Sequence, residues 1–381
     1  MLNNESPTTI SCDPSTPDKM HLFYTFKISN LSSTMKARFT KYTLQFKQPS
    51  GTSRGVYTNR EVWFILITNG DTTGIGECAP LPNLSIERPK EMSAKLLQVC
   101  EQIDYFIQFP EELNNWSSIR FGLETALLDL KNGGQQLLFP SAFTRAEQGI
   151  PINGLIWMGT PDFMKQQIRS KLDAGFRCIK MKIGAIDFET EFSLLKEIRK
   201  EFSSKEITLR VDANGAYSYA TALENLKRLS DLQIHSVEQP IEAGKWDEMA
   251  LLCEKSPVPV ALDEELIGVF NQKELAQIAQ LIHPAYFILK PSLHGGLAGC
   301  EKWIELANQH SIGWWVTSAL ESNIGLNAIA QWTFEQNVTT EQGLGTGQLF
   351  TNNLDSPLQI EGDRLWYQPS HPWNLKPLSN E

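Results

Sequence analysis

Three acidic residues and three lysines in the middle of the chain each end a short apolar segment. The acids, at intervals of 26 and 25 residues, are Asp212, Glu238 and Asp263, and the lysines are Lys180, Lys182 and Lys290. Such an interval fits one strand–helix–strand unit, so these side chains would lie at the same end of successive parallel strands. Carboxylates beside ammonium groups predict a site for a hard cation surrounded by candidate bases.

The spacing within each segment indicates which side chains share a face. Lys180 and Lys182 are two residues apart on an expected strand, so both would point into a barrel while their apolar neighbours face the helices. The same parity places Arg210, Asp212 and Asn214 on one face of the next strand. A Lys-x-Lys pair alone is more often a solvated strand edge, but the three spaced carboxylates favour a site.

The donor types indicate which ion the site would hold. Asp and Glu oxygens without His or Cys suit Mg²⁺, with Mn²⁺ as an alternative ion. If the three acids served only as helix N-caps, Glu238, which precedes Gln239, would be a poor N-cap. We expect Mg²⁺ to bind a small-molecule carboxylate substrate and to stabilise the enediolate formed when the α-proton leaves. A lysine beside the cation and a second lysine would have its pKa lowered toward neutrality and could take that proton.

The composition excludes several other classes of protein. The chain has 381 residues, 41% hydrophobic and 20% charged, which is typical of a soluble globular protein with two domains. A net charge of −10 argues against a nucleic-acid partner. No apolar run approaches the roughly 18 to 20 residues that span a membrane. The six cysteines are scattered without a CxxC pair, which predicts free thiols in a reducing cytoplasm. The oligomeric state stays open.

The front of the chain predicts an extension followed by a small domain. Residues 3–19 are rich in Ser, Thr, Pro, Asn and Asp, so we expect residues 1–34 to be an extension with little structure and take Met35 as a hypothetical native start. Residues 35–140 predict an α+β capping domain. Its expected strands are 37–46 and 61–68, and its expected helices are 89–106 and 117–132.

The rest of the chain alternates short apolar strands with amphipathic helices. This pattern over residues 141–350 predicts the α/β class, with a (β/α)8-type barrel as catalytic domain. The expected strands are 152–157, 178–183, 208–213, 236–238, 258–263, 286–290, 313–317 and a short one before Gly345. Residues 351–381 are expected to pack back on the capping domain.

Five segments together resemble the muconate-lactonizing subgroup of the enolase superfamily, over the chain from about Ala37 onward. They are Lys180-Met181-Lys182, Val211-Asp212-Ala213-Asn214-Gly215, Val237-Glu238-Gln239-Pro240, Leu262-Asp263-Glu264 and Leu289-Lys290-Pro291-Ser292. Within that subgroup the chain is similar to the o-succinylbenzoate synthases of menaquinone biosynthesis. The segments that suggest this are 49–55, 76–82, 321–327 and 343–347.

The resemblance implies a syn elimination of water from 2-succinyl-6-hydroxy-2,4-cyclohexadiene-1-carboxylate. Lys182 would be the base, Lys180 would add positive charge, and Lys290 would stabilise the intermediate from the opposite face. Asp212, Glu238 and Asp263 would hold Mg²⁺. The loop at 50–55 and the turn at 78–82 would close over the pocket. Candidate substrate-binding or supporting residues are Arg210, Asn214, Ser318, Glu321, Gly345, Ser53 and Arg54.

Two other classes of function remain open. An N-succinylamino acid racemase or a dipeptide epimerase of the same superfamily would need both Lys182 and Lys290 as opposed bases. Dipeptide epimerases show an Asp-x-Asp on the last barrel strand, where this chain reads Gly-Leu-Gly-Thr-Gly at 343–347. A barrel that only binds a metabolite is the third alternative, since fold alone does not imply catalysis.

Overall fold

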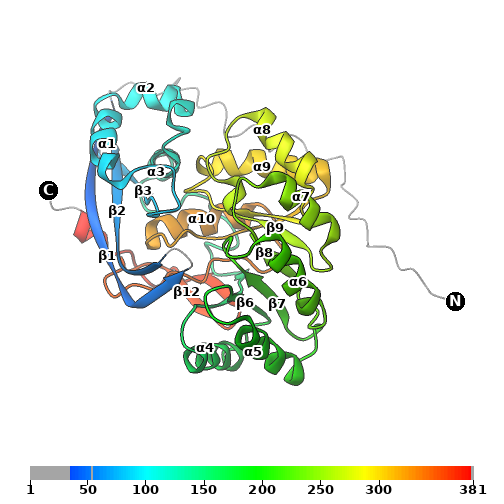
Figure 1. Cartoon of the computed structure of the whole chain (residues 1–381). Helices are drawn as coiled ribbons and strands as arrows, with labels where there is room; N and C mark the ends of the chain where they lie inside the picture. Colours follow the sequence, from blue (N-terminus) through cyan, green and yellow to red (C-terminus); the bar gives the residue numbers. More distant parts are fainter. Residues whose placement is uncertain (1–34, 53–54, 379–381) are drawn as a thin grey trace, which may run out of the picture. The chain divides into compact units, whose positions relative to one another are not determined.

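The computed structural model describes residues 35–52 and 55–378 (Figure 1). These described residues form one compact unit by their contacts. The prediction of an unstructured extension falls on residues 1–34, which lie outside the described residues.

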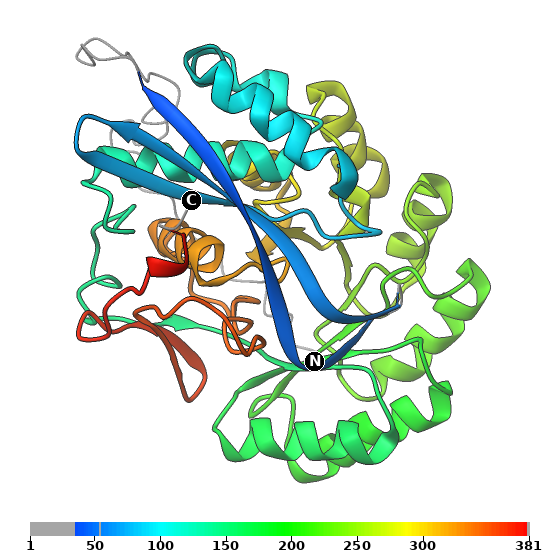
Figure 2. The ribbon, with the colours of Figure 1, turned by 90° about the vertical axis from the view of Figure 1, so that its left-hand side faces the viewer.

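An antiparallel sheet with helices on one face opens the described chain. Its strands are β1 (Lys36–Thr52), β2 (Gly55–Asn69) and β3 (Thr72–Cys78), followed by η1 (Pro89–Glu91), α1 (Met92–Glu101), α2 (Ile103–Gln108), η2 (Pro110–Leu113) and α3 (Ser117–Lys131). Figure 2 shows the long β1–β2 ribbon running across the front of this N-terminal module. Helix α3 packs directly on β3. The two elements approach so closely at Gly76 that a Cβ there would lie 1.9 Å from the carbonyl oxygen of Gly122. The single helix predicted at 89–106 is instead three short pieces, η1, α1 and α2.

A parallel sheet of seven strands in chain order forms the barrel. The strands are β5 (Gly154–Ile156), β6 (Cys178–Lys182), β7 (Thr208–Asp212), β8 (Ser236–Glu238), β9 (Val260–Leu262), β10 (Tyr286–Leu289) and β11 (Gly313–Val316). The helices that follow them are α4 (Pro161–Asp173), α5 (Phe188–Glu201), α6 (Tyr219–Ser230), α7 (Trp246–Lys255), α8 (Gln272–Gln277) with η4 (Ile278–Ile282), α9 (Gly296–His310) and α10 (Asn323–Glu335). All five residues of β6 are buried, Ile179 and Met181 completely.

The eighth predicted strand is reduced to single bridges. Gln342 pairs in parallel with Ile152, and Gly343 pairs in parallel with Thr317, so the segment before Gly345 joins the two edges of the sheet. A side chain at Gly343 would lie 2.2 Å from Thr317 Oγ1, so this residue must be small. The expectation of eight strands is therefore wrong in number for the described residues, although the predicted segment does close the barrel.

The C-terminal segment lies against the N-terminal module. β12 (Leu358–Glu361) and β13 (Arg364–Tyr367) form a small sheet with β4 (Ile150–Pro151), and η5 (Lys376–Leu378) follows. The hydroxyl of Tyr42 donates to the carbonyl of Asn352 at 2.9 Å, and Phe350 shares a hydrophobic core with Phe46. The domain boundaries given above stay a prediction.

The cysteines and the helices of the described residues can be compared with the expectations from composition. The five cysteines among the described residues are free thiols. Over the same residues, no helix combines the length and the apolarity that crossing a membrane requires.

Candidate active site

The pocket lies where the strand ends of the barrel meet the N-terminal module. Its charged lining comes from the barrel: Lys180, Lys182, Asp212, Glu238, Glu264 and Lys290. Its neutral polar lining includes Asn153, Asn214, Thr317, Ser318 and Thr346. Apolar and aromatic side chains complete it, namely Tyr57, Leu81, Leu84, Leu155, Trp157, Trp315, Ala319 and Leu320. The pocket therefore combines charged, neutral polar and apolar lining.

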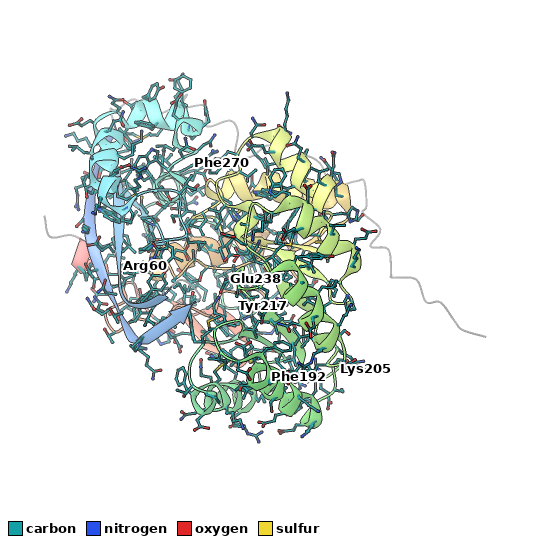
Figure 3. All side chains as sticks on the ribbon, in the orientation of Figure 1. Arg60, Phe192, Lys205, Tyr217, Glu238 and Phe270 are labelled. Atoms are coloured by element: carbon teal, nitrogen blue, oxygen red, sulfur yellow. The ribbon has the colours of Figure 1, made fainter. Side chains whose placement is uncertain are left out.

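Strand register brings the distant charges into one row. Lys182 is the cross-strand partner of Asp212, and Asp212 is that of Glu238. Each of these residues ends its strand, so the alignment of β6, β7 and β8 places all three side chains at the same rim of the barrel. Figure 3 labels Glu238 among the barrel elements.

Each lysine of the site is paired with a carboxylate. Lys180 Nζ lies 2.7 Å from both carboxylate oxygens of Glu238 and 3.0 Å from Asp212 Oδ2. Lys182 Nζ lies 2.9 Å from Asp212 Oδ2 and 2.7 Å from Asn214 Oδ1. Lys290 Nζ donates to Asp263 Oδ2. The three acids and three lysines predicted from spacing thus form two buried ion-pair groups, one of Lys180, Lys182, Asp212 and Glu238 and one of Lys290 and Asp263.

These ion pairs hold two lysines in their charged form. Burial lowers the pKa of Lys180, but the charges of Asp212 and Glu238 outweigh it and the net pKa shift is upward. Burial likewise lowers the pKa of Lys290, and the charge of Asp263 reverses the shift. Burial raises the pKa of Asp212, yet Lys180 and Lys182 bring it well below its usual range. In Lys180 and Lys290 the carboxylates therefore dominate over burial. The lowered pKa expected for a lysine beside a bound cation stays a prediction.

The donor set fits a hard divalent cation, although the acids are engaged with lysines. Asp212, Glu238 and Asp263 offer only carboxylate oxygens, the donors that Mg²⁺ prefers. Asp263 Oδ1 is buried and has no hydrogen-bond partner, so a ligand oxygen is available there. Among the described residues no three His, Cys, Asp or Glu side chains already stand together as a metal site. Asp212, Glu238 and Asp263 are the residues that would hold the ion.

Gln239 links the loops that carry two of these acids. Its Oε1 accepts from the backbone N–H of Asp263 at 3.1 Å and of Glu265 at 3.3 Å. Its Nε2 donates to Ile241 O at 3.0 Å and to Glu265 Oε2 at 3.2 Å. Gln239 itself is left-handed, with φ +39°, a conformation that the surrounding bonds must enforce. The sequence pattern placed Gln239 only as the residue after Glu238 and did not predict that it links these loops.

Some other predicted site residues line the pocket and some do not. Asn214, Ser318 and Gly345 line it. Arg210 lies outside the lining, donating to Glu341 O at 2.8 Å and stacking 4.1 Å from the Trp315 ring. Glu321 is also outside it, fully buried, and accepts from Ala319 N at 2.7 Å. Ser53 and Arg54 lie outside the described residues.

Sequence reasoning missed most of the apolar lining. The alternation of Asn153, Leu155 and Trp157 on a predicted strand could have revealed that these residues share the inner face. Leu81 falls within the turn predicted to close over the pocket, whereas no local pattern marks Tyr57, because its position depends on how the N-terminal module packs on the barrel.

Models of known protein families match both the N-terminal module and the barrel. The model for the MenC N-terminal domain matches residues 34–130, and the model for the enolase C-terminal domain-like family matches residues 164–368. The o-succinylbenzoate synthase of Desulfotalea psychrophila is 46% identical over 365 residues, which cover 87% of this chain and 99% of the relative. The chain belongs to the o-succinylbenzoate synthase family of the enolase superfamily.

One solved structure supports this assignment, and a second shares the fold. The crystal structure of MenC from Desulfotalea psychrophila has a TM-score of 0.79 and 42% identity, covering 88% of this chain and all of that one. A dipeptide epimerase from Cytophaga hutchinsonii, solved with Mg and a dipeptide, has a TM-score of 0.75 at 21% identity over 90% of this chain and 94% of that one. The predicted family, the barrel with its capping domain and the enzyme class, a hydro-lyase, are confirmed.

Proposed function

We propose that the chain catalyses the Mg²⁺-dependent syn elimination of water from 2-succinyl-6-hydroxy-2,4-cyclohexadiene-1-carboxylate, giving o-succinylbenzoate for menaquinone biosynthesis in the cytoplasm. The observation that carries this proposal is the convergence of Lys180, Lys182 and Lys290 on three carboxylates in a family member with 46% identity to a synthase.

Lys182 is the proposed base. Its Nζ is held by acceptors on Asp212 and Asn214, which fix its position at the rim of the pocket. As the free amine, it takes the proton α to the ring carboxylate, and the electrons of the C–H bond move toward that carboxylate. The same ammonium then gives its proton to the departing hydroxyl as the C–O bond breaks, so water leaves and the ring becomes aromatic. A single lysine serves both steps because a syn elimination has both groups on one face.

The remaining charges serve the developing enediolate. Lys180 and Lys290, both held in their charged form, place positive charge beside the carboxylate where negative charge accumulates. Asp212, Glu238 and Asp263 would hold the divalent cation. When bound, that ion supplies Lewis-acid stabilisation of the substrate carboxylate. The apolar lining, including Leu81, excludes water and strengthens these interactions.

The test is ultraviolet absorbance of the cyclohexadiene substrate with and without Mg²⁺. We expect a metal-dependent loss of the diene signal, with o-succinylbenzoate identified by mass. No change with protein shown to bind Mg²⁺ would contradict the proposal.

A second candidate is an N-succinylamino acid racemase, because the pocket contains lysines from two separate strands, Lys182 on β6 and Lys290 after β10. Racemisation needs two bases on opposite faces, whereas the elimination needs one. Exchange of the α-proton of an N-succinylamino acid in D₂O, followed by NMR, would reveal this activity. We expect any α-proton exchange of the N-succinylamino acid to be no faster than the elimination of water from the cyclohexadiene substrate.

A further inference from the structure

A buried arginine links two walls of the pocket without lining it. Arg60 of β2 is 2% exposed, and its two terminal nitrogens donate to carbonyls from distant parts of the chain. Nη2 donates to Ala79 O at 2.5 Å, and Nη1 donates to Ala319 O. Figure 3 labels Arg60 in the N-terminal module. Leu81 and Leu320, each within two residues of one of these carbonyls, both line the pocket. One guanidinium therefore spans from the module to the barrel.

The barrel side of this link is a strained turn. Leu320 has φ +65°, a left-handed conformation that is unfavourable for a branched side chain. Such a conformation persists only where surrounding groups enforce it. The residues on either side of Leu320 must therefore be held firmly.

Two buried acids hold those residues. Glu321 accepts from Ala319 N at 2.7 Å and from Ser292 Oγ. Glu77 of β3 accepts from Ser322 N and from Gly325 N, both at 2.8 Å, at the start of α10. Glu77 and Glu321 are fully buried, and their charges oppose the effect of burial on the pKa of Arg60. The polar backbone around Leu320 is thus fixed by side chains that never reach the pocket.

We propose that Arg60, with Glu77 and Glu321, is a positioning group that sets the spacing between the Leu81 and Leu320 walls and so determines substrate specificity. This inference rests on the proposed function. In the proposed reaction the lysines, and the cation that the carboxylates would hold, engage the reacting carboxylate, so the remainder of the substrate has to fit against the neutral walls. Small displacements of a wall then change which substrates fit, while the charged groups stay in place.

The experiment compares Arg60→Met, Arg60→Lys and the matched control Arg88→Met, whose arginine lies exposed in the same module. Substrate kinetics, Mg²⁺ binding and hydrogen–deuterium exchange of peptides covering 317–325 are measured for each. We expect Arg60→Met to raise KM about tenfold with kcat and Mg²⁺ affinity close to wild type, and to speed exchange of 317–325. Arg60→Lys keeps the charge but has one nitrogen, so an intermediate KM is expected. Arg88→Met should match wild type.

Unchanged KM and unchanged exchange in folded Arg60→Met would overturn the inference. If that variant does not fold, Arg60→Lys decides, since wild-type KM and exchange in it would also overturn the inference. If the wild type neither turns over the substrate nor binds o-succinylbenzoate, the proposed function fails. The exchange of 317–325 then still decides whether Arg60 fixes the wall.

Discussion

The two halves of the pocket are built in opposite ways. The strand ends from β6 to β10 carry charged side chains that pair with one another directly in the pocket. The walls from Tyr57, Leu81, Leu84 and Leu320 are neutral where they meet the pocket, and their charged support is buried behind them. We infer that the charged strand ends provide the chemistry, whereas the N-terminal module and the turn at Leu320, with barrel residues such as Trp157 and Trp315, provide the fit. Substitutions in the two halves should consequently affect different kinetic parameters.

The largest effect is expected in the charged half. Lys182→Ala removes the base and should lower kcat by about 10³-fold or more, since general base catalysis commonly contributes 10²–10⁴. Because Lys180 remains 3.0 Å from Asp212 Oδ2, thermal unfolding and Mg²⁺ binding should stay close to wild type. Lys165→Ala, at an exposed lysine of α4, is the matched control. Substantial residual turnover in Lys182→Ala would refute the assignment of the base.

Asp263→Asn tests the metal site and the ion pair together. It removes a carboxylate ligand and leaves the buried Lys290 ammonium without its partner. We expect weaker Mg²⁺ binding by calorimetry and a loss of about 3 kcal/mol in the free energy of unfolding. Asp173→Asn, at an exposed aspartate, should change neither. Unaltered Mg²⁺ affinity in Asp263→Asn would remove this residue from the ligand set.

Leu84→Ala probes the neutral half. Shortening this wall should raise KM about tenfold, while kcat stays near wild type because no charged group moves. The control is Leu97→Ala, an exposed leucine of α1. A drop in kcat without a change in KM would mean that the neutral wall takes part in the chemistry.

The smallest effect concerns the acid behind the wall. Burial raises the pKa of Glu77 to about 7 from an ordinary value of 4.5, against the hydrogen bonds from Ser322. The protonated group therefore favours the fold, and its contribution to stability is full below pH 4.5 and is lost as the pH rises through about 7.

Urea unfolding from pH 4.5 to 7 measures this contribution. The free energy of unfolding of Glu77→Gln should gain on that of wild type across this range, whereas Glu91→Gln, at an exposed glutamate, should follow wild type. A constant difference between Glu77→Gln and wild type would show that Glu77 does not titrate there.

The sequence predicts the charged half far better than the neutral half. Asp212, Glu238 and Lys182 end strands of fixed register, so regular spacing along the chain was enough to predict their proximity. Strand positions were predicted to within a few residues, but the last strand was too short to form more than bridges at Gln342 and Gly343. Arg60 could not have been predicted, because its partners lie 19 and 259 residues away and are backbone carbonyls, which leave no sequence pattern.

The most direct test of this division of labour is calorimetric binding of o-succinylbenzoate, with Mg²⁺ present, to Lys182→Ala and Leu84→Ala side by side. The account predicts near wild-type affinity for Lys182→Ala, which lacks only the base, and weakened affinity for Leu84→Ala, which lacks part of the wall. Weakened binding to Lys182→Ala together with intact binding to Leu84→Ala would contradict it.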